Sequence, residues 1–232
     1  MVRGRGAEGF ITAAGQVLRR LGETQLGVIK DASTVLAKGL LAGGSVHVFG
    51  TGHSSIVARE LAGRAGGLAE MTELALDDLV LAGWASKQEL LDGRLERRPE
   101  AAQALLEQAV VGEHDGLVVV SHTGCNGAPV EMALEAHRRH LPVVAVTSLE
   151  RSERAISRHP SGQRLFEVAD VTIDICAPYA DAVLEAQPGL YVCGVSTLAG
   201  VFVAQALVAE IVERYVEAGK VPAILPSRNL AS

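Results

Sequence analysis

The sequence predicts an α/β fold built around a doubly wound parallel sheet. Strand-like apolar runs alternate along the chain with segments of helical periodicity, which is the pattern of successive βαβ units. Runs such as residues 117–120 are apolar without interruption, as expected for parallel strands that helices cover on both faces. The chain has 232 residues, of which 48% are hydrophobic, and this suffices for one domain but not for two.

The first predicted element is a long helix. Apolar residues recur at helical spacing from Phe10 to Leu41, which indicates one long or broken helix that Gly43 and Gly44 end. Its apolar stripe has no obvious place in a single layered domain, so we expect a partner to cover it. A strand over 46–49, a helix over 54–65 and a helix over 101–111, introduced by Pro99, follow in order.

The second half of the chain continues the alternation. The strand over 117–120 is followed by a helix from Pro129 to about residue 140, because proline is favoured in the first turn of a helix. Strands over 142–146 and 171–175 come next, and Gly219 ends a long helix over 195–217. We find no internal repeat or linker. The predicted parts are an N-terminal helical extension (1–43), one domain (44–219) and a C-terminal tail (220–232).

Composition and charge exclude several classes of function. Lys and Arg number 21 against 27 Asp and Glu, and the net charge of −6 argues against nucleic-acid binding. The three cysteines lack CxxC spacing and predict reduced thiols, neither a metal site nor a disulfide framework. The first ten residues lack the apolar stretch of a signal peptide, and the most apolar segment, 195–209, is too short to span a bilayer. We therefore expect a cytoplasmic protein without membrane contact.

Two glycine-rich loops each follow a predicted buried strand and open a helix. They are residues 50–55 (GTGHSS) and 121–127 (SHTGCNG). In an open parallel sheet, ligands bind beyond the carboxyl ends of the strands, where backbone N–H groups and the helix dipole favour an anion such as phosphate. Neither loop has the Walker A or GxGxxG pattern, so ATP, NAD and other cofactors are not expected. The alternative is two ordinary strand-to-helix turns with Ser54 and Asn126 as helix caps.

The loop residues resemble the sugar isomerase (SIS) domain family. Ser121-x-Thr123-Gly124 after the strand LVVV resembles the family's S-x-S/T-G loop, and residues 50–54 resemble its first loop. Residues 143–148 (VVAVTS) resemble the strand that follows, and the resemblance covers roughly residues 44–217. The GTGHS loop, residues 157–162 and the tail residues 226–229 resemble a branch of single-domain phosphosugar-binding proteins. The resemblance implies a three-layer αβα sandwich of the flavodoxin-like type.

The resemblance also implies a ligand and a set of binding residues. A sugar phosphate is expected to bind with its phosphate on the second loop and its sugar over the first. The expected binding residues are Gly52, Ser54, Ser55, Ser121, His122, Thr123, Asn126, Ser196 and Thr197. Asn126 stands where the family usually has Ser or Thr, although its amide can still donate to a phosphate. A homodimer or tetramer with the site at a subunit interface is implied as well.

The resemblance also implies a reaction, because enzymes of the SIS family remove a proton from the carbon next to a sugar carbonyl. This step requires a base and an acid. Glu60 is the leading candidate for the base, because it lies about 9 Å along the helix from Ser54, and Glu70 is the second. The alternative is that Glu60 is a solvated residue paired with Arg64 at i+4. His53 is the leading candidate for the acid and His122 another, although a structural role is equally open for each imidazole.

Three functions remain open from the sequence. The first is elimination on a hexose or N-acetylhexosamine 6-phosphate, slightly favoured because residues 195–217 lack the histidine that the family's isomerases carry there. The second is aldose–ketose isomerisation at the same site. The third is a sensor that binds a sugar phosphate without catalysis, although no basic DNA-reading unit accompanies it. Arg158 and His159 could meet a substrate carboxylate or acetamido group, or could simply be solvated.

Overall fold

The computed structural model describes residues 6–227, so the ends of the predicted extension and tail, 1–5 and 228–232, lie outside the described residues. Its centre is a parallel sheet of five strands in the order β2-β1-β3-β4-β5, which confirms the predicted α/β class. The strands are β1 (Val46–Gly50), β2 (Met71–Leu74), β3 (Gly116–Val120), β4 (Val143–Thr147) and β5 (Val171–Asp174). The order reverses between β1 and β3, where open sheets of this type bind their ligands.

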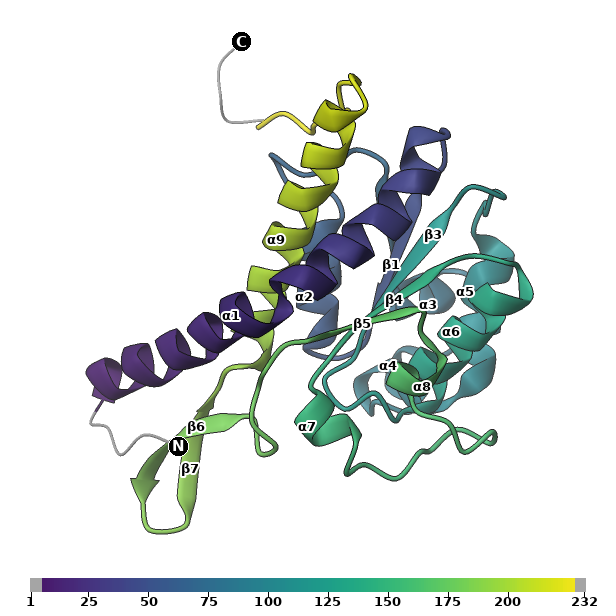
Figure 1. Ribbon diagram of the computed structural model, residues 1–232. Helices are drawn as coiled ribbons and strands as arrows, with labels where there is room; N and C mark the ends of the chain where they lie inside the picture. The colour runs from purple at the N-terminus through teal and green to yellow at the C-terminus, as the bar shows by residue number, and fades with distance from the viewer. Residues whose placement is uncertain (1–5, 228–232) are drawn as a thin grey trace.

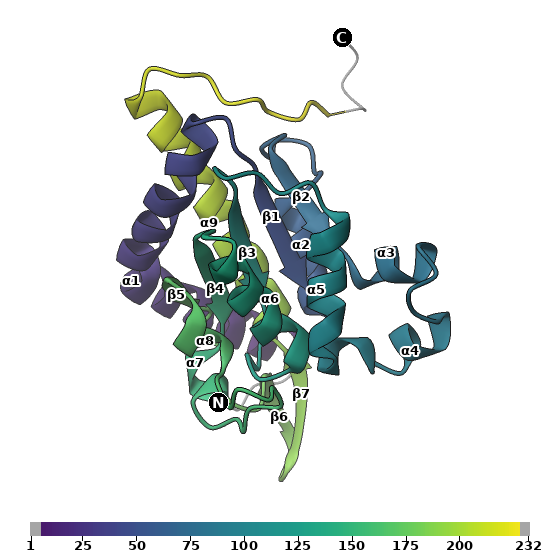
Figure 2. The ribbon, with the colours of Figure 1, turned by 90° about the vertical axis from the view of Figure 1, so that its right-hand side faces the viewer.

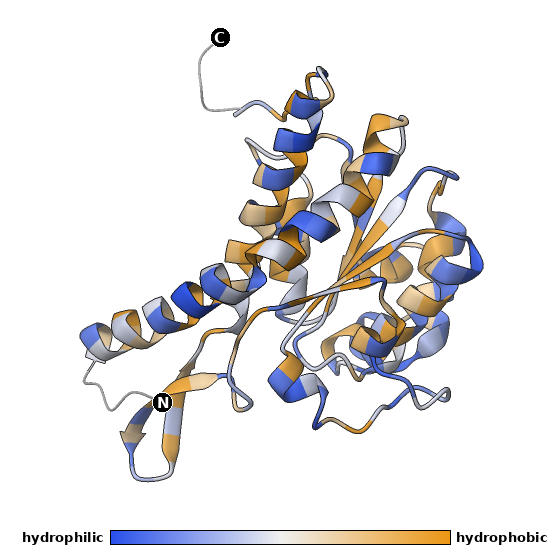
Figure 3. Cartoon of the chain, in the orientation of Figure 1, coloured by the Kyte–Doolittle hydropathy of each residue, from blue (hydrophilic) through white to orange (hydrophobic). Residues whose placement is uncertain are grey.

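Helices cover both faces of the sheet and explain its uninterrupted apolar strands. Every residue of β1, β3 and β4 is buried. Along β3, Val118 and Val120 belong to the core on one face and Leu117 and Val119 to the core on the other, because successive strand side chains point to opposite faces. Figure 3 shows these strands as mainly hydrophobic.

The helices form the two outer layers of a sandwich (Figures 1 and 2). One layer consists of α1 (Gly6–Leu41), α2 (Ser54–Leu61) and α9 (Ser196–Glu217). The other is built mainly from α5 (Pro99–Gln108), α6 (Gly127–Arg138) and α8 (Leu165–Val168). An excursion between β2 and α5 holds α3 (Leu76–Leu81), α4 (Lys87–Leu91) and the 3₁₀ helix η1 (Leu95–Arg97), and α7 (Leu149–Ser152) follows β4.

The long N-terminal helix is one unbroken element that belongs to the main core. Its buried side chains, among them Leu21, Ile29 and Leu36, pack against α9, β5 and β6. The expectation that its apolar stripe has no place within the chain is therefore wrong. The stripe is covered because α9, distant in sequence, crosses and packs against it (Figure 1).

A β-hairpin that the sequence did not predict separates β5 from α9. Its strands, β6 (Ala182–Gln187) and β7 (Leu190–Gly194), pair antiparallel and project from the body of the molecule (Figure 1). The edge strand β2 and the excursion from α3 to η1 were not predicted either. Each of these elements is short, and β2 is partly exposed, so none carries the long apolar period that predicts an element reliably.

Element ends differ from the prediction by a few residues. The helix predicted over 54–65 stops at Leu61, since Gly63 and Gly66 adopt positive φ angles that end a helix. The helix predicted from Pro129 begins two residues earlier, at Gly127. In the tail, the backbone N–H of Leu225 donates to Gly67 O and that of Ala69 donates to Ala223 O, so the tail docks on the segment after α2.

By length and composition alone, α9 is long and apolar enough to cross a membrane. The expectation that the most apolar segment is too short to span a bilayer was therefore too strong. Core helices of soluble proteins pass the same test. In this fold, α9 packs along both α1 and α2, and Leu207 and Ile211 are completely buried there.

Candidate active site

One cavity lies at the carboxyl ends of β1 and β3, where the strand order reverses. Its volume is about 450 Å³, which is within the usual size of a small-molecule site. Its lining includes nine of the residues singled out from the sequence, namely Gly52, His53, Ser54, Ser121, His122, Thr123, Asn126, Ser196 and Thr197. The fold therefore brings together both glycine-rich loops and the start of α9.

The first loop turns directly from β1 into α2. Gly50 is required here, because a Cβ atom at this position would lie 2.5 Å from the backbone oxygen of Ser54. Ser54 is the first residue of α2, and His53 occupies the N-cap position without a side-chain cap bond. Ser55 does not line the cavity, since its hydroxyl donates to Gly52 O at 2.8 Å.

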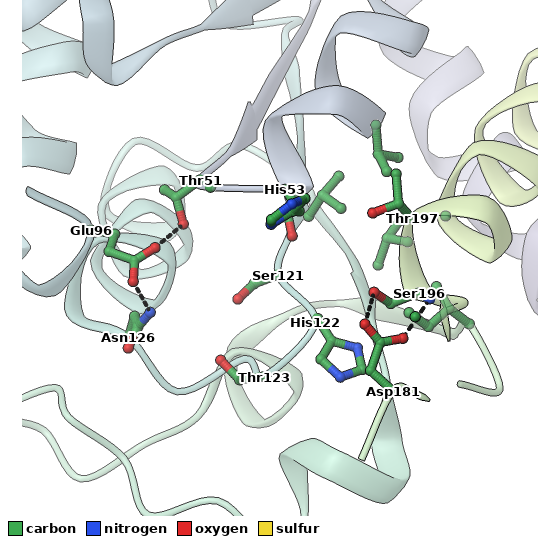
Figure 4. Close-up of a pocket in the computed structure, with 18 residues that line it drawn as sticks. Thr51, His53, Glu96, Ser121, His122, Thr123, Asn126, Asp181, Ser196 and Thr197 are labelled. Carbon is green, nitrogen blue, oxygen red and sulfur yellow. Dashed lines mark hydrogen bonds between the residues drawn. The ribbon is translucent and has the colours of Figure 1, made fainter. Parts of the chain in front are cut away.

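The second loop carries hydroxyl groups into the middle of the cavity (Figure 4). Ser121 Oγ accepts the backbone N–H of Gly124 at 3.2 Å, and the thiol of the buried Cys125 donates to Thr123 Oγ1 at 3.4 Å. Both hydroxyls keep hydrogen-bonding capacity for a ligand. Asn126 stands at the N-cap position of α6 but makes no side-chain cap bond there. The interpretation of Ser54 and Asn126 as capping side chains is therefore wrong.

A carboxylate that the sequence did not single out closes one end of the cavity. Glu96, on η1, accepts a hydrogen bond from Thr51 Oγ1 at 3.0 Å and another from Asn126 Nδ2 at 3.0 Å. Arg158 Nη1 donates to Asn126 Oδ1 at 2.7 Å, so this amide has one orientation that satisfies both neighbours. Asn126 therefore links Glu96 to the loop of Arg158, in addition to any bond it offers a phosphate.

A second carboxylate lies at the other end of the cavity (Figure 4). Asp181 Oδ1 accepts the backbone N–H groups of Val195 and Ser196 at 2.9 and 2.7 Å, and Oδ2 accepts the Ser196 hydroxyl at 2.9 Å. The carboxylate thus binds the N-terminal end of α9, where the helix dipole favours a negative charge. Its backbone has a φ of 63°, which Asp tolerates better than most residues.

His122 lies beside Asp181 (Figure 4), and its imidazole has a lowered pKa. Burial, the largest effect, lowers the pKa of His122, while the Asp181 carboxylate raises it and the Arg151 guanidinium lowers it. The net shift is downward, so the imidazole is neutral at pH 7. Its Nδ1 is buried and has no hydrogen-bond partner among the described residues. A neutral imidazole can accept a proton from a ligand, and because Nδ1 is buried, the ring nitrogen available for this is Nε2.

Neither carboxylate chosen from the sequence as a base lines the cavity. Glu60 forms an ion pair with Arg64, as the alternative interpretation expected. It also accepts a hydrogen bond from Gln205 Nε2 at 2.8 Å and lies outside the cavity lining. Glu70 immediately precedes β2 and therefore lies at the amino edge of the parallel sheet, opposite the cavity. Helical spacing correctly placed Glu60 on α2 but did not determine which way its side chain points.

The Arg158–His159 loop is held by a buried carboxylate instead of facing the cavity. His159 Nε2 lies 2.7 Å from Glu131 Oε2, and only 7% of the His159 side chain is exposed. Gln103 Nε2 also donates to Glu131, at 2.7 Å, and Arg138 forms an ion pair with it. The expectation that His159 meets a substrate group is wrong within one chain, because its ring is already bonded and buried. Arg158 reaches the site only through Asn126.

Comparisons with known proteins agree with this geometry. A family model described as the SIS domain matches residues 9–148. A UPF0309 protein of Caldanaerobacter subterraneus is 37% identical over 217 residues, covering 92% of this chain and 87% of that protein. A UPF0309 protein of Halalkalibacterium halodurans is 35% identical over 216 residues, covering 93% and 88%.

Solved structures share the fold at low sequence identity. A phosphoheptose isomerase from Francisella tularensis superposes with a TM-score of 0.61 at 16% identity, over 88% of this chain and 95% of that one. The Vibrio vulnificus NanR protein, complexed with ManNAc-6P, superposes with a TM-score of 0.56 at 15% identity, over 93% and 65%. With the family model spanning most of the domain and relatives aligned along nearly the whole chain, this protein belongs to the SIS domain family.

Proposed function

We propose that this protein binds a hexose or hexosamine 6-phosphate in the cavity and moves a proton at the carbon next to the sugar carbonyl. The observation that carries the proposal is the pair of hydroxyls, Ser121 and Thr123, at the strand switch point beside the neutral imidazole of His122. Two structural neighbours, a phosphoheptose isomerase and the NanR protein complexed with ManNAc-6P, support a sugar phosphate as the ligand.

The proposed reaction begins with one proton transfer. His122 takes the proton from C2, and the C–H electron pair forms the C1–C2 double bond of an enediolate whose negative charge rests on O1. Returning the proton to C1, while the O2 proton moves to O1, completes isomerisation, since C2 then becomes the carbonyl carbon and C1 carries the alcohol. Expelling the substituent on C3 instead completes elimination, for which His53 is the available acid in the lining. The absence of histidine from α9 favours elimination, whereas the isomerase neighbours favour isomerisation.

The test is incubation with hexose and hexosamine 6-phosphates in D₂O, followed by NMR. We expect deuterium at C2 of the recovered aldose, together with either a ketose labelled at C1 or an unsaturated product, and the product identifies the second step. His122→Gln is expected to lower the exchange rate by about 10²–10⁴-fold, as for loss of a general base. Binding without exchange for every sugar phosphate would favour the sensor function instead.

Glu60→Gln is the informative companion variant. Since Glu60 lies outside the cavity of its own chain, a site complete within one chain predicts that exchange survives this substitution. Loss of exchange in Glu60→Gln, with binding retained within about tenfold, would assign the base to Glu60 reaching the site of a second copy. Loss in His122→Gln alone would assign it to His122.

A further inference from the structure

The cavity has an unusual charge for a site proposed to bind an anion. The side chains that line it include two carboxylates, Glu96 and Asp181, and no lysine or arginine among the described residues. We propose that the cavity accepts sugar phosphates whose sugar part is uncharged or carries an amino group, and discriminates against those whose sugar part carries a carboxylate. This inference rests on the proposed function, since it specifies the substrate class of the same site.

The Glu96 end keeps its negative charge facing the cavity. Each carboxylate oxygen receives one hydrogen bond, from Thr51 or from Asn126, and both donors are neutral. Arg158 is bonded to the same amide, since its guanidinium donates to Asn126 Oδ1, but it does not line the cavity. Both oxygens therefore retain acceptor capacity for a hydroxyl or an ammonium group.

The Asp181 end is negative as well. Three donors from the start of α9 stabilise the ionised carboxylate, and the nearby His122 is neutral because burial lowers its pKa. Arg151 is near enough to influence His122, but its guanidinium stacks over the Tyr179 ring, 4.3 Å from the centroid, and does not line the cavity. A ligand carboxylate at this end would meet a like charge without a neutralising side chain.

The conclusion does not depend on the direction in which the sugar lies. Ser121 and Thr123 stand between the two ends (Figure 4). A phosphate bound by these hydroxyls leaves its sugar to extend toward either Glu96 or Asp181. In both directions the sugar meets a carboxylate that can accept hydrogen bonds from hydroxyl or ammonium groups but repels another carboxylate.

A matched pair of acyclic ligands tests the proposal. D-glucitol 6-phosphate and 6-phospho-D-gluconate differ only at the terminal carbon, which is an alcohol in the first and a carboxylate in the second. By calorimetry we expect the carboxylate ligand to bind the wild-type protein at least tenfold more weakly, and D-glucosamine 6-phosphate to bind at least as tightly as glucitol 6-phosphate. The discrimination should shrink as salt concentration rises.

Charge-neutralising variants locate the effect. Glu96→Gln retains hydrogen bonding to Thr51 and Asn126, and Asp181→Asn suits the positive φ. The variant at the end that the sugar occupies should reduce the discrimination severalfold. Glu107→Gln is the control, because it makes the same charge change on the exposed surface of α5, outside the lining.

The outcomes separate this inference from the function on which it rests. If both acyclic ligands bind the wild-type protein with the same affinity, the inference is overturned and sugar-phosphate binding stands. If Glu107→Gln reduces the discrimination as much as both cavity variants do, the effect is one of net charge and the inference is likewise overturned. If no sugar phosphate and no inorganic phosphate binds at all, the proposed function itself fails.

Discussion

At the scale of single residues, Asn126 shows how neighbours change the role of a side chain. From the sequence alone, Asn126 is expected either to donate a hydrogen bond to a phosphate or to cap a helix. In the fold its amide group links the Glu96 carboxylate to the Arg158 guanidinium and also lines the cavity. The hydroxyls of Ser121 and Thr123 lie in the middle of the cavity (Figure 4).

Removing either hydroxyl should weaken phosphate binding without unfolding the protein. Ser121→Ala or Thr123→Ala is expected to cost about 1–3 kcal/mol of binding free energy, the size of a hydrogen bond to a charged group. Calorimetry with a sugar phosphate measures the change, and Ser55→Ala serves as the control because Ser55, at the start of α2, also carries a hydroxyl but lies outside the lining. Unchanged affinity in both variants would move the phosphate elsewhere.

The pH dependence of turnover should report the lowered pKa of His122. A proton acceptor must be neutral, and burial lowers the pKa of this imidazole below the usual value of about 6.5. As pH falls, activity is therefore expected to persist below pH 6.5 and then to decline as His122 becomes protonated. Substrate-saturated rates between pH 4.5 and 8 check this, and an acid limb above pH 7 would contradict it.

At the scale of elements, the placement of η1 against α6 brings Glu96 to the cavity. Gly127 permits this close packing, because a Cβ atom there would lie 2.4 Å from the backbone oxygen of Arg97, the neighbour of Glu96. The excursion from α3 to η1 is thus fixed at the point where it contributes to the site. Its charged sequence resembles a solvated loop, and the packing of η1 against α6 places Glu96 in the lining of the cavity.

Gly127→Ala should therefore disturb both stability and ligand binding. We expect a loss of about 1–3 kcal/mol in the free energy of unfolding, since the backbone of η1 must shift, together with weaker binding of a sugar phosphate. Gly22→Ala is the matched control, because nothing lies within 4 Å of the added methyl group in the interior of α1. It should be neutral or stabilising by about 0.5–1 kcal/mol. Urea unfolding with and without ligand compares the two, and equal effects would contradict this account of η1.

At the scale of the whole molecule, an apolar surface on α2 and α9 remains uncovered in one chain. Ile56, Leu198 and Phe202 are 47%, 40% and 42% exposed, and Thr197 and Gly200 on the same stretch of α9 line the cavity. This surface, and not the buried stripe of α1, is the reason to expect self-association. Such contact would also place Glu60, on α2, close to a second copy.

We predict a homodimer or larger assembly formed through this surface. Light scattering of a dilute solution should give at least twice the chain mass of 24.3 kDa. Phe202→Glu places a charge in the surface and should yield the monomer while far-ultraviolet circular dichroism is retained. Leu81→Glu, at a more exposed apolar residue on α3, should leave the assembly unchanged. A wild-type monomer would refute the prediction.

The sequence by itself determined the parallel class of the sheet, four of its five strands and the two loops. The apolar runs over residues 117–120 and 143–146 predict buried strands directly, because a strand covered on both faces is apolar at nearly every position. A glycine-rich turn directly after such a strand likewise predicts a ligand site at the carboxyl edge of the sheet. These signals are local, and the family resemblance rested on them.

Only the tertiary structure decided which charged groups line the cavity. Glu96 and Asp181 come from segments without a helical or strand period, and Glu60, the choice from helical spacing, lies outside the cavity. Spacing along a helix fixes distance along its axis, but the side on which a ligand lies depends on the elements packed around it. The charge of the cavity is therefore a property of chain segments brought together by folding, and local sequence could not reveal it.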